Sequence, residues 1–290
     1  MFYTVEELVQ QANDRFNGSV AELMIETEIE LTGRSREEIV TLMSRNLTVM
    51  KSSVKDGLTD SKSVSGLTGG DAAKLDRYIQ SGKTLADSTI LSAARNAIAV
   101  NELNAKMGLV CATPTAGSAG CLPAVISVAI EKLELTEEEQ LNFLFSAGAF
   151  GLVIANNASI SGAEGGCQAE VGSASAMSAA ALTLAAGGSA YQASQAICFV
   201  IKNMLGLICD PVAGLVEVPC VKRNAMGASF ALVAADMALA GIESKIPVDE
   251  VIDAMYQVGS SLPTAFRETA EGGLAATPTG KRLAQEIFGN

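Results

Sequence analysis

Six cysteines and the absence of histidine limit the chemistry that this 290-residue chain can perform. Without histidine, the chain alone can form no Ser-His-Asp triad, no Cys-His pair and no HExxH zinc motif. Any general base must be a carboxylate, Lys, Cys, Tyr, an activated hydroxyl, or a group from another chain. The cysteines are therefore the first residues to consider as nucleophiles or metal ligands.

Three cysteines, Cys167, Cys209 and Cys220, stand at breaks in the helical pattern, where a thiolate can turn toward a shared centre. Structural zinc generally takes four Cys or His ligands, often in closely spaced pairs, and the sequence has no C-x2-C pair. A cubane iron–sulfur cluster is normally held by Cys thiolates. If only three are supplied, one iron stays open as a Lewis acid for a substrate hydroxyl. Spacing alone does not decide between such a site and buried thiols.

The other cysteines are in different sequence contexts. Cys198 lies in the apolar helical stretch AICFVIKNML and is expected to be a core thiol, because free cysteine packs as a small hydrophobe. Cys111, after Gly-Leu-Val, is expected in the core as well, whereas Cys121 stands beside a Gly-rich segment and fits either role.

Four Gly-rich segments interrupt the helical pattern, and their backbone N–H groups could bind an anion. None matches a Walker or Rossmann motif, and each could instead be a simple connection between helices. They are SGLTGGDA (65–72), TPTAGSAG (113–120), SGAEGGCQAE (161–170) and CDPVAGLVEVPC (209–220).

The elements that must position these residues are helices. Thr4 with Glu7, Ser35 with Glu38 and Thr136 with Glu139 are capping-box signals, whereas alternating strand patterns and hairpin turns are scarce. We expect an all-α protein, a multi-helix bundle with buried small-residue helices and Gly-rich loops around the site. Residues 1–290 are predicted to form one domain, in which 1–55 are amphipathic outer helices.

Charge and hydropathy exclude several partners. A formal net charge of −12 repels phosphate backbones, so nucleic acid is not expected. Long uncharged stretches are rich in Ala, Ser and Gly and predict core helices, not membrane spans. The start of the chain does not resemble a secretory signal, which indicates a cytoplasmic protein with reduced cysteines. The uncharged stretches are 108–130, 140–163 and 171–201.

At these residues the chain resembles the α subunit of bacterial iron–sulfur L-serine dehydratases. The resemblance implies conversion of L-serine to pyruvate and ammonia at a 4Fe–4S cluster, without pyridoxal phosphate. It also implies an all-helical catalytic domain and Cys167, Cys209 and Cys220 as the ligands. The matching segments, from about residue 65 to 275, are SGLTGGDA, ATPTAGSAGCLPAV, EGGCQAEVGSASAM, CDPVAGLVEVPC, VKRNAMGA and RETAEGGLA.

A serine substrate also needs donors for its carboxylate and a base for its Cα proton. The backbone of two Gly-rich loops, helped by Lys222 or Arg223, is expected to bind the carboxylate, and Lys222 and Glu170 are candidate bases. The expected substrate contacts are Thr68, Gly69, Gly70, Thr115, Gly117, Ser118 and Arg223.

Departures from single-chain relatives indicate a two-subunit enzyme. The chain lacks their N-terminal β domain, and it ends in Phe-Gly-Asn without a cysteine that could fold back into the site. We therefore expect a separate β subunit and a higher αβ oligomer. Two alternatives stay open: another iron–sulfur hydro-lyase acting on a small hydroxy acid, and a cluster-bearing electron carrier or scaffold.

Overall fold

The structure, a computed structural model, describes residues 1–289. Within this range the chain forms α-helices and short 3-10 helices and no β-strand, which confirms the predicted all-α class. The α-helices are α1 (Val5–Phe16), α2 (Val20–Thr32), α3 (Arg36–Gly57), α4 (Asp71–Gln80), α5 (Ser88–Ala105), α6 (Cys121–Leu133), α7 (Glu137–Asn157), α8 (Gly162–Ala185), α9 (Ala190–Met204), α10 (Cys220–Leu239), α11 (Val248–Ser261) and α12 (Pro278–Phe288). The 3-10 helices are η1 (Val212–Gly214), η2 (Thr264–Phe266) and η3 (Gly273–Ala276).

Local sequence signals set the starts of several helices. In a capping box the cap hydroxyl accepts the N–H of the third helical residue, whose side chain binds back, and loss of such a cap costs about 1 kcal/mol. The three predicted boxes begin α1, α3 and α7, and α9 starts in the same way. The residue pairs are Thr4 with Glu7, Ser35 with Glu38, Thr136 with Glu139 and Ser189 with Gln192.

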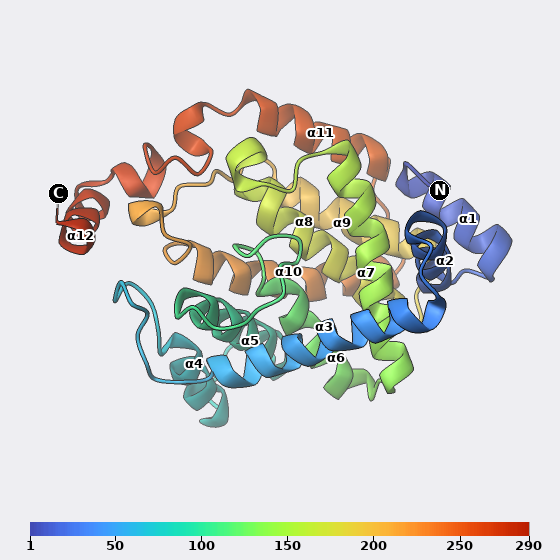
Figure 1. Ribbon diagram of the computed structural model, residues 1–290, viewed down its shortest axis with the longest axis horizontal. Helices are drawn as coiled ribbons and strands as arrows, with labels where there is room; N and C mark the ends of the chain where they lie inside the picture. The colour runs from blue at the N-terminus through green and yellow to red at the C-terminus, as the bar shows by residue number, and fades with distance from the viewer. Residues whose placement is uncertain (290) are drawn as a thin grey trace.

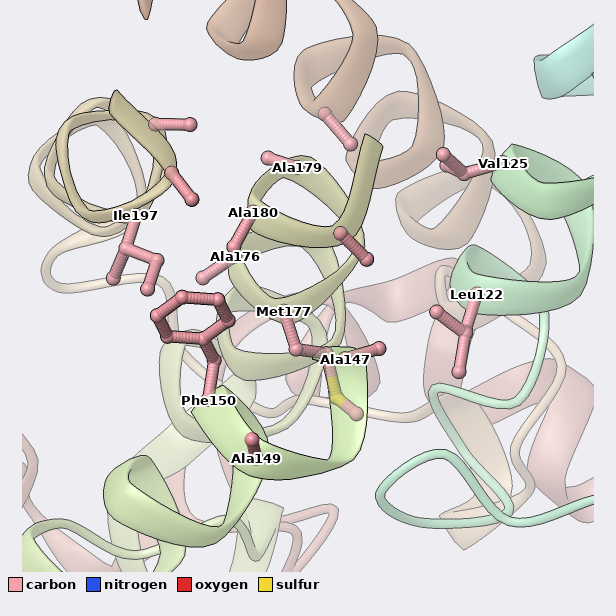
Figure 2. Close-up of a cluster of buried hydrophobic side chains, with 14 of the residues drawn as sticks. Leu122, Val125, Ala147, Ala149, Phe150, Ala176, Met177, Ala179, Ala180 and Ile197 are labelled. Carbon is pink, nitrogen blue, oxygen red and sulfur yellow. The ribbon is translucent and has the colours of Figure 1, made fainter. Parts of the chain in front are cut away.

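Helix α8 lies at the centre of the bundle and packs against α6, α7, α9, α10 and α11 (Figure 1). Its small side chains let the neighbouring helices approach closely. Figure 2 shows Phe150 of α7 and Ile197 of α9 facing Ala176 and Ala180 of α8. On the α10 side, a Cβ on Gly227 would lie only 2.4 Å from Ser175 Oγ, so glycine is needed for this approach. The predicted buried small-residue helices are confirmed.

The first three helices join the same core. Phe2, Leu8 and Leu23 are buried in the hydrophobic cluster that extends to Met255 of α11. The N-terminus of α1 is also bound to α11, because Asp249 accepts the N–H groups of Val5 and Glu6 at 2.8 and 3.1 Å. That residues 1–290 form a single domain stays a prediction.

The uncharged stretches contribute to helices that are packed inside the bundle, although residues 108–120 of the first stretch belong to a connection. Residues 108–130 include most of α6, 140–163 include most of α7, and 171–201 include most of α8 and α9. Within residues 1–289, none of the helices combines the length and apolar character that a membrane crossing requires.

Four long connections gather on the side of the bundle away from α1 and α2 (Figure 1). They run over residues 58–70, 106–120, 205–219 and 262–277, and together with the start of α8 they contain all the Gly-rich segments. Function is commonly found on such loops, held by a rigid scaffold.

Candidate active site

The three cysteines predicted as ligands lie at a helix break, in a connection and at a helix start. Cys167 follows Gly166, whose φ of 74° and ψ of −176° break α8 near its beginning. Cys209 lies between α9 and α10, and Cys220 is the first residue of α10. All three side chains are buried free thiols.

These three thiols lie close enough to affect one another's protonation. Burial raises the pKa of Cys209, and charges at Cys167 and Cys220 raise it further. Burial and Cys167 also raise the pKa of Cys220 to about 12. Cys167 and Cys209 belong to a small buried cluster that is separate from the main core. The fold therefore brings together residues that are far apart in the sequence.

Arg223 is the cation beside the thiols. Burial raises the pKa of Cys167 to about 11, although the charge of Arg223 and its hydrogen bond to the sulfur act in the opposite direction. Arg223 Nη2 lies 2.9 Å from Oδ1 of the buried Asp210, and Nη1 donates to the Ile208 carbonyl at 2.8 Å. Because these contacts hold the guanidinium in place, it can stabilise a thiolate at Cys167.

Two carboxylates meet the thiols at Gly162, the first residue of α8. A Cβ on Gly162 would lie 3.0 Å from Cys209 Sγ, 3.1 Å from Glu268 Oε2 and 3.3 Å from Glu170 Oε2. The hydroxyl of Thr115 donates to the other oxygen of Glu170. Burial raises the pKa of Glu170, the Thr115 hydrogen bond lowers it, and the charge of Glu268 raises it.

The side chain of Asn224 joins the 113–120 loop to α10. Its amide nitrogen donates to the carbonyls of Gly117 and Cys220 at 2.8 and 3.0 Å, and its oxygen accepts the N–H of Gly120 at 3.2 Å. Asn224 has no exposed surface. It therefore fixes the 113–120 loop relative to the residue that carries the third thiol.

The 58–70 loop is held against the 205–219 connection by Glu217. This buried carboxylate accepts the hydroxyl hydrogen bonds of Ser63 and Ser65 at 2.6 and 2.7 Å. Glu217 lies three residues before Cys220, so the contact places the first Gly-rich segment beside the thiol site.

Glu102 of α5 holds the end of the same loop. It has no exposed surface, and its two oxygens accept the N–H groups of Gly70 and Asp71 at 3.0 and 2.9 Å. These N–H groups begin α4, where a carboxylate is favoured by the helix dipole. The anion at this helix start is thus supplied by the protein itself.

Comparison with known proteins identifies the family. The sequence profile described as serine dehydratase alpha chain matches residues 16–275. The chain belongs to this family. The quoted motifs of this serine dehydratase α chain start at residue 65, whereas the family match already begins at residue 16.

Named relatives of this α chain include proteins named alpha chain and longer proteins. It is 58% identical to the probable L-serine dehydratase alpha chain of Bacillus subtilis, over 100% of this chain and 96% of that protein. It is 41% identical to the L-serine dehydratase alpha chain of Peptoniphilus asaccharolyticus, over 99% of both chains. Its match to the L-serine dehydratase of Streptomyces coelicolor, 39% identical, spans 94% of this chain and 60% of that longer protein.

Several of the backbone donors expected to bind substrate already have partners in this α chain. The N–H of Gly70 binds Glu102, and the N–H groups of Thr115 and Ser118 bond to each other's hydroxyls at 3.3 Å. Gly117 lies beside Glu170, since a Cβ there would be 2.5 Å from Glu170 Oε1.

Thr68 and Gly69 are buried in the 58–70 loop, and the Thr68 hydroxyl has no hydrogen-bond partner within residues 1–289. A Cβ on Gly69 would lie 2.3 Å from the Ser61 carbonyl, so the loop closes tightly on itself here. That these residues, with Gly117 and Arg223, contact substrate stays a prediction.

Lys222 lies in an exposed ion pair. Its Nζ is 2.5 Å from Asp71 Oδ2, and Asp71 also pairs with Lys74 at 2.8 Å. Burial raises the pKa of Asp71, but the hydrogen bonds and charges of Lys222 and Lys74 lower it to about 2. Lys222 therefore joins the starts of α4 and α10, whereas Glu170, the other candidate base, lies beside the thiols.

The remaining three cysteines lie in, or pack against, two different buried clusters. Cys198 has no exposed surface and lies in the main core, and the partly buried Cys111 packs against that core. Cys121 joins the small cluster of Cys167 and Cys209, and its sulfur lies 3.6 Å from the Asn224 carbonyl.

Sequence reasoning missed Glu102, Asp210, Glu217, Asn224 and Glu268. Asp210 accepts the N–H of Leu274 at 2.7 Å in addition to its contact with Arg223. Four of these five residues lie inside the motifs that resemble the family. Their position in those motifs was the only sequence signal that could have marked them as site residues. Glu102 lies outside these motifs, in the last turn of α5.

Proposed function

We propose that the chain is the catalytic α subunit of an iron–sulfur L-serine dehydratase, a lyase that converts L-serine to pyruvate and ammonia. The observation that carries this proposal is the meeting of three buried thiols with Arg223 and Glu170 where the Gly-rich segments converge. Family membership and the names of the relatives support the same reaction.

The donor set fits a 4Fe–4S cluster held by Cys167, Cys209 and Cys220. Within residues 1–289 no group of three Cys, Asp or Glu side chains is arranged to hold one metal ion. Three convergent thiolates suit a polynuclear cluster. When bound, such a cluster would supply a Lewis-acidic iron that assists departure of the serine hydroxyl. The proposal includes no pyridoxal phosphate.

The reaction is an elimination that needs a base and a dry pocket. Loss of the Cα proton and of the Cβ–O bond gives aminoacrylate, which tautomerises and hydrolyses to pyruvate and ammonia. Glu170 is the better base candidate, because it is buried beside the thiols and oriented by Thr115. Lys222, by contrast, is bound to Asp71 at the surface. Burial of the thiols limits the access of water, which strengthens electrostatic effects in the pocket.

We also propose a separate β subunit that covers this side of the bundle in a higher αβ oligomer. The relatives named alpha chain and the longer Streptomyces protein support a second component. On the connections that carry the Gly-rich segments, Val64, Met107 and Leu109 are 90%, 87% and 73% exposed. Exposed apolar side chains in such a position suit a protein interface.

The test is anaerobic reconstitution with iron and sulfide, followed by an assay for pyruvate from L-serine in the presence of the β subunit. We expect visible cluster absorption and pyruvate formation, with little turnover of hydroxy acids. Turnover of a hydroxy acid but not of L-serine would contradict the proposal and favour another iron–sulfur hydro-lyase.

A further inference from the structure

Glu268 is placed at the thiol site by its backbone. Its N–H donates to the Cys209 carbonyl at 2.9 Å, and the N–H of Cys209 donates to the Phe266 carbonyl at 2.9 Å. Glu268 has a φ of 62°, in the left-handed region that a non-glycine residue rarely adopts. Such a conformation persists where the surroundings impose it, and it is concentrated at functional sites.

Each of the other acidic side chains around the site has at least one donor or cation from the protein beside its carboxylate. Asp210 has Arg223 and the N–H of Leu274, Glu217 has two serine hydroxyls, and Glu102 has two backbone N–H groups.

Glu268 differs from these acids. In the described range 1–289, neither a hydrogen-bond donor nor a cation is paired with its carboxylate, and Oε2 of Glu170 likewise has no donor. Oε2 of Glu268 and Oε2 of Glu170 lie 3.1 and 3.3 Å from the position that a Cβ on Gly162 would take, and Cys209 Sγ is the third neighbour of that position.

The charges around Gly162 indicate which kind of group would bind there. Two carboxylates, Glu170 and Glu268, lie beside the thiols, where the cation Arg223 is already 2.9 Å from Asp210. A group entering here is favoured if it is positive and donates hydrogen bonds. A serine substrate has one such group, its α-ammonium, whereas a hydroxy acid has only a neutral hydroxyl at that position.

We propose that Glu268 accepts the α-ammonium group of the substrate and so makes the site specific for amino acids. This inference rests on the proposed dehydratase function and names the residue that selects the substrate class. Gly162 contributes by leaving the space beside both carboxylates free of a side chain.

The test compares Glu268→Gln with wild type in the reconstituted α chain with its β subunit. Glutamine keeps the size of the side chain and removes its charge. Two ligands are used: L-serine, and L-glycerate, which has a hydroxyl in place of the ammonium. Binding is followed by KM, by inhibition constants and by the change in the visible spectrum of the cluster.

We expect Glu268→Gln to raise the KM for L-serine about 10- to 100-fold, as for loss of a charge-assisted hydrogen bond. The inhibition constant of L-glycerate should stay the same or fall, and cluster absorption should stay unchanged. The matched control is Glu271→Gln, an exposed acid in the same segment, which should leave both constants at the wild-type values.

Equal weakening of L-serine and L-glycerate would overturn the inference, since it would indicate a general positioning role. An unchanged KM for L-serine would also overturn it. Gly162→Ala provides a second variant, expected to weaken L-serine binding by crowding the two carboxylates. If wild type makes no pyruvate at all, the dehydratase function itself fails, and this outcome is distinguishable from the others.

Discussion

Asn224 and Gly117 are joined by a buried hydrogen bond of 2.8 Å that links α10 to the 113–120 loop. The same side chain binds Cys220 and Gly120. Its loss would leave several buried polar groups of the loop without partners.

We expect Asn224→Ala to lower the free energy of unfolding by about 2–4 kcal/mol, because buried groups left unpaired are costly. Cluster content after reconstitution should fall as well. Denaturant unfolding and visible absorption measure the two effects. Asn203→Ala serves as the control, because the exposed Asn203 side chain bonds only to a carbonyl of its own helix. If Asn224→Ala were as stable as Asn203→Ala, Asn224 would not hold the 113–120 loop as we infer.

Replacing Cys167, Cys209 or Cys220 by Ser should abolish cluster absorption and pyruvate formation, because each removes one of three thiolate ligands. Cys198→Ala should preserve both, since that thiol lies in the main core and contributes packing only. Iron and sulfide analysis of each reconstituted variant is the measurement. Our ligand assignment is wrong if Cys198→Ala loses the cluster while Cys209→Ser keeps it.

Exposure to air should inactivate the enzyme, since oxidants reach an open iron as readily as substrate does. Activity should return after anaerobic treatment with ferrous iron and a thiol, and pyridoxal phosphate alone should not restore it. The measurement is pyruvate formation before and after each treatment. Full activity after prolonged exposure to air and an iron chelator would be incompatible with the cluster mechanism.

Adding the β subunit to the reconstituted chain should raise serine turnover by orders of magnitude and slow inactivation by oxygen. The physical reason is that a cover over the loop side would exclude water and bury Val64, Met107 and Leu109. An anaerobic titration with pyruvate detection tests this. Leu109→Asp should weaken the rise in serine turnover that the β subunit causes. The control is Leu85→Asp, the same substitution at an exposed position of the α4–α5 connection, which should leave that rise unchanged. Full activity without β subunit would refute the idea.

The ion pairs of Asp71 should make the free energy of unfolding depend on pH in the acid range. Its pKa is about 2, below the ordinary value of 3.8, so its ion pairs stabilise the fold fully above pH 3.8. This contribution is lost as the pH falls through about 2. The effect should be about 1 kcal/mol or less because the pairs are largely exposed. Between pH 5 and pH 2, the free energy of unfolding should fall less in Asp71→Asn than in wild type. In the control Asp253→Asn it should fall as much as in wild type.

Local patterns predicted the helices well because capping is a short-range effect. Thr4, Ser35 and Thr136 each form the predicted box with an acid three residues later. Small residues such as Ala176 and Ala180 likewise marked the buried α8. These features depend on neighbours along the chain, so sequence alone is sufficient to identify them.

The site was only partly predictable, because its contacts join residues far apart in the sequence. The motifs identified the three cysteines, but no local pattern shows that Glu102 binds the N–H of Gly70 or that Glu268 lies beside Gly162. As a result, Gly70 was assigned to substrate while its N–H already has a partner. Asn224 was overlooked although it stands only four residues after Cys220.

Beyond the break at Gly166, α8 contributes buried side chains to two separate clusters. Cys167, Val171 and Ala174 belong to the small thiol cluster, whereas Ala176 and Ala180 belong to the main hydrophobic core. Because the two buried clusters are separate, an emptied site can relax without melting the bundle. We therefore expect that the proposed iron–sulfur cluster can be removed and rebuilt while the helical bundle stays folded.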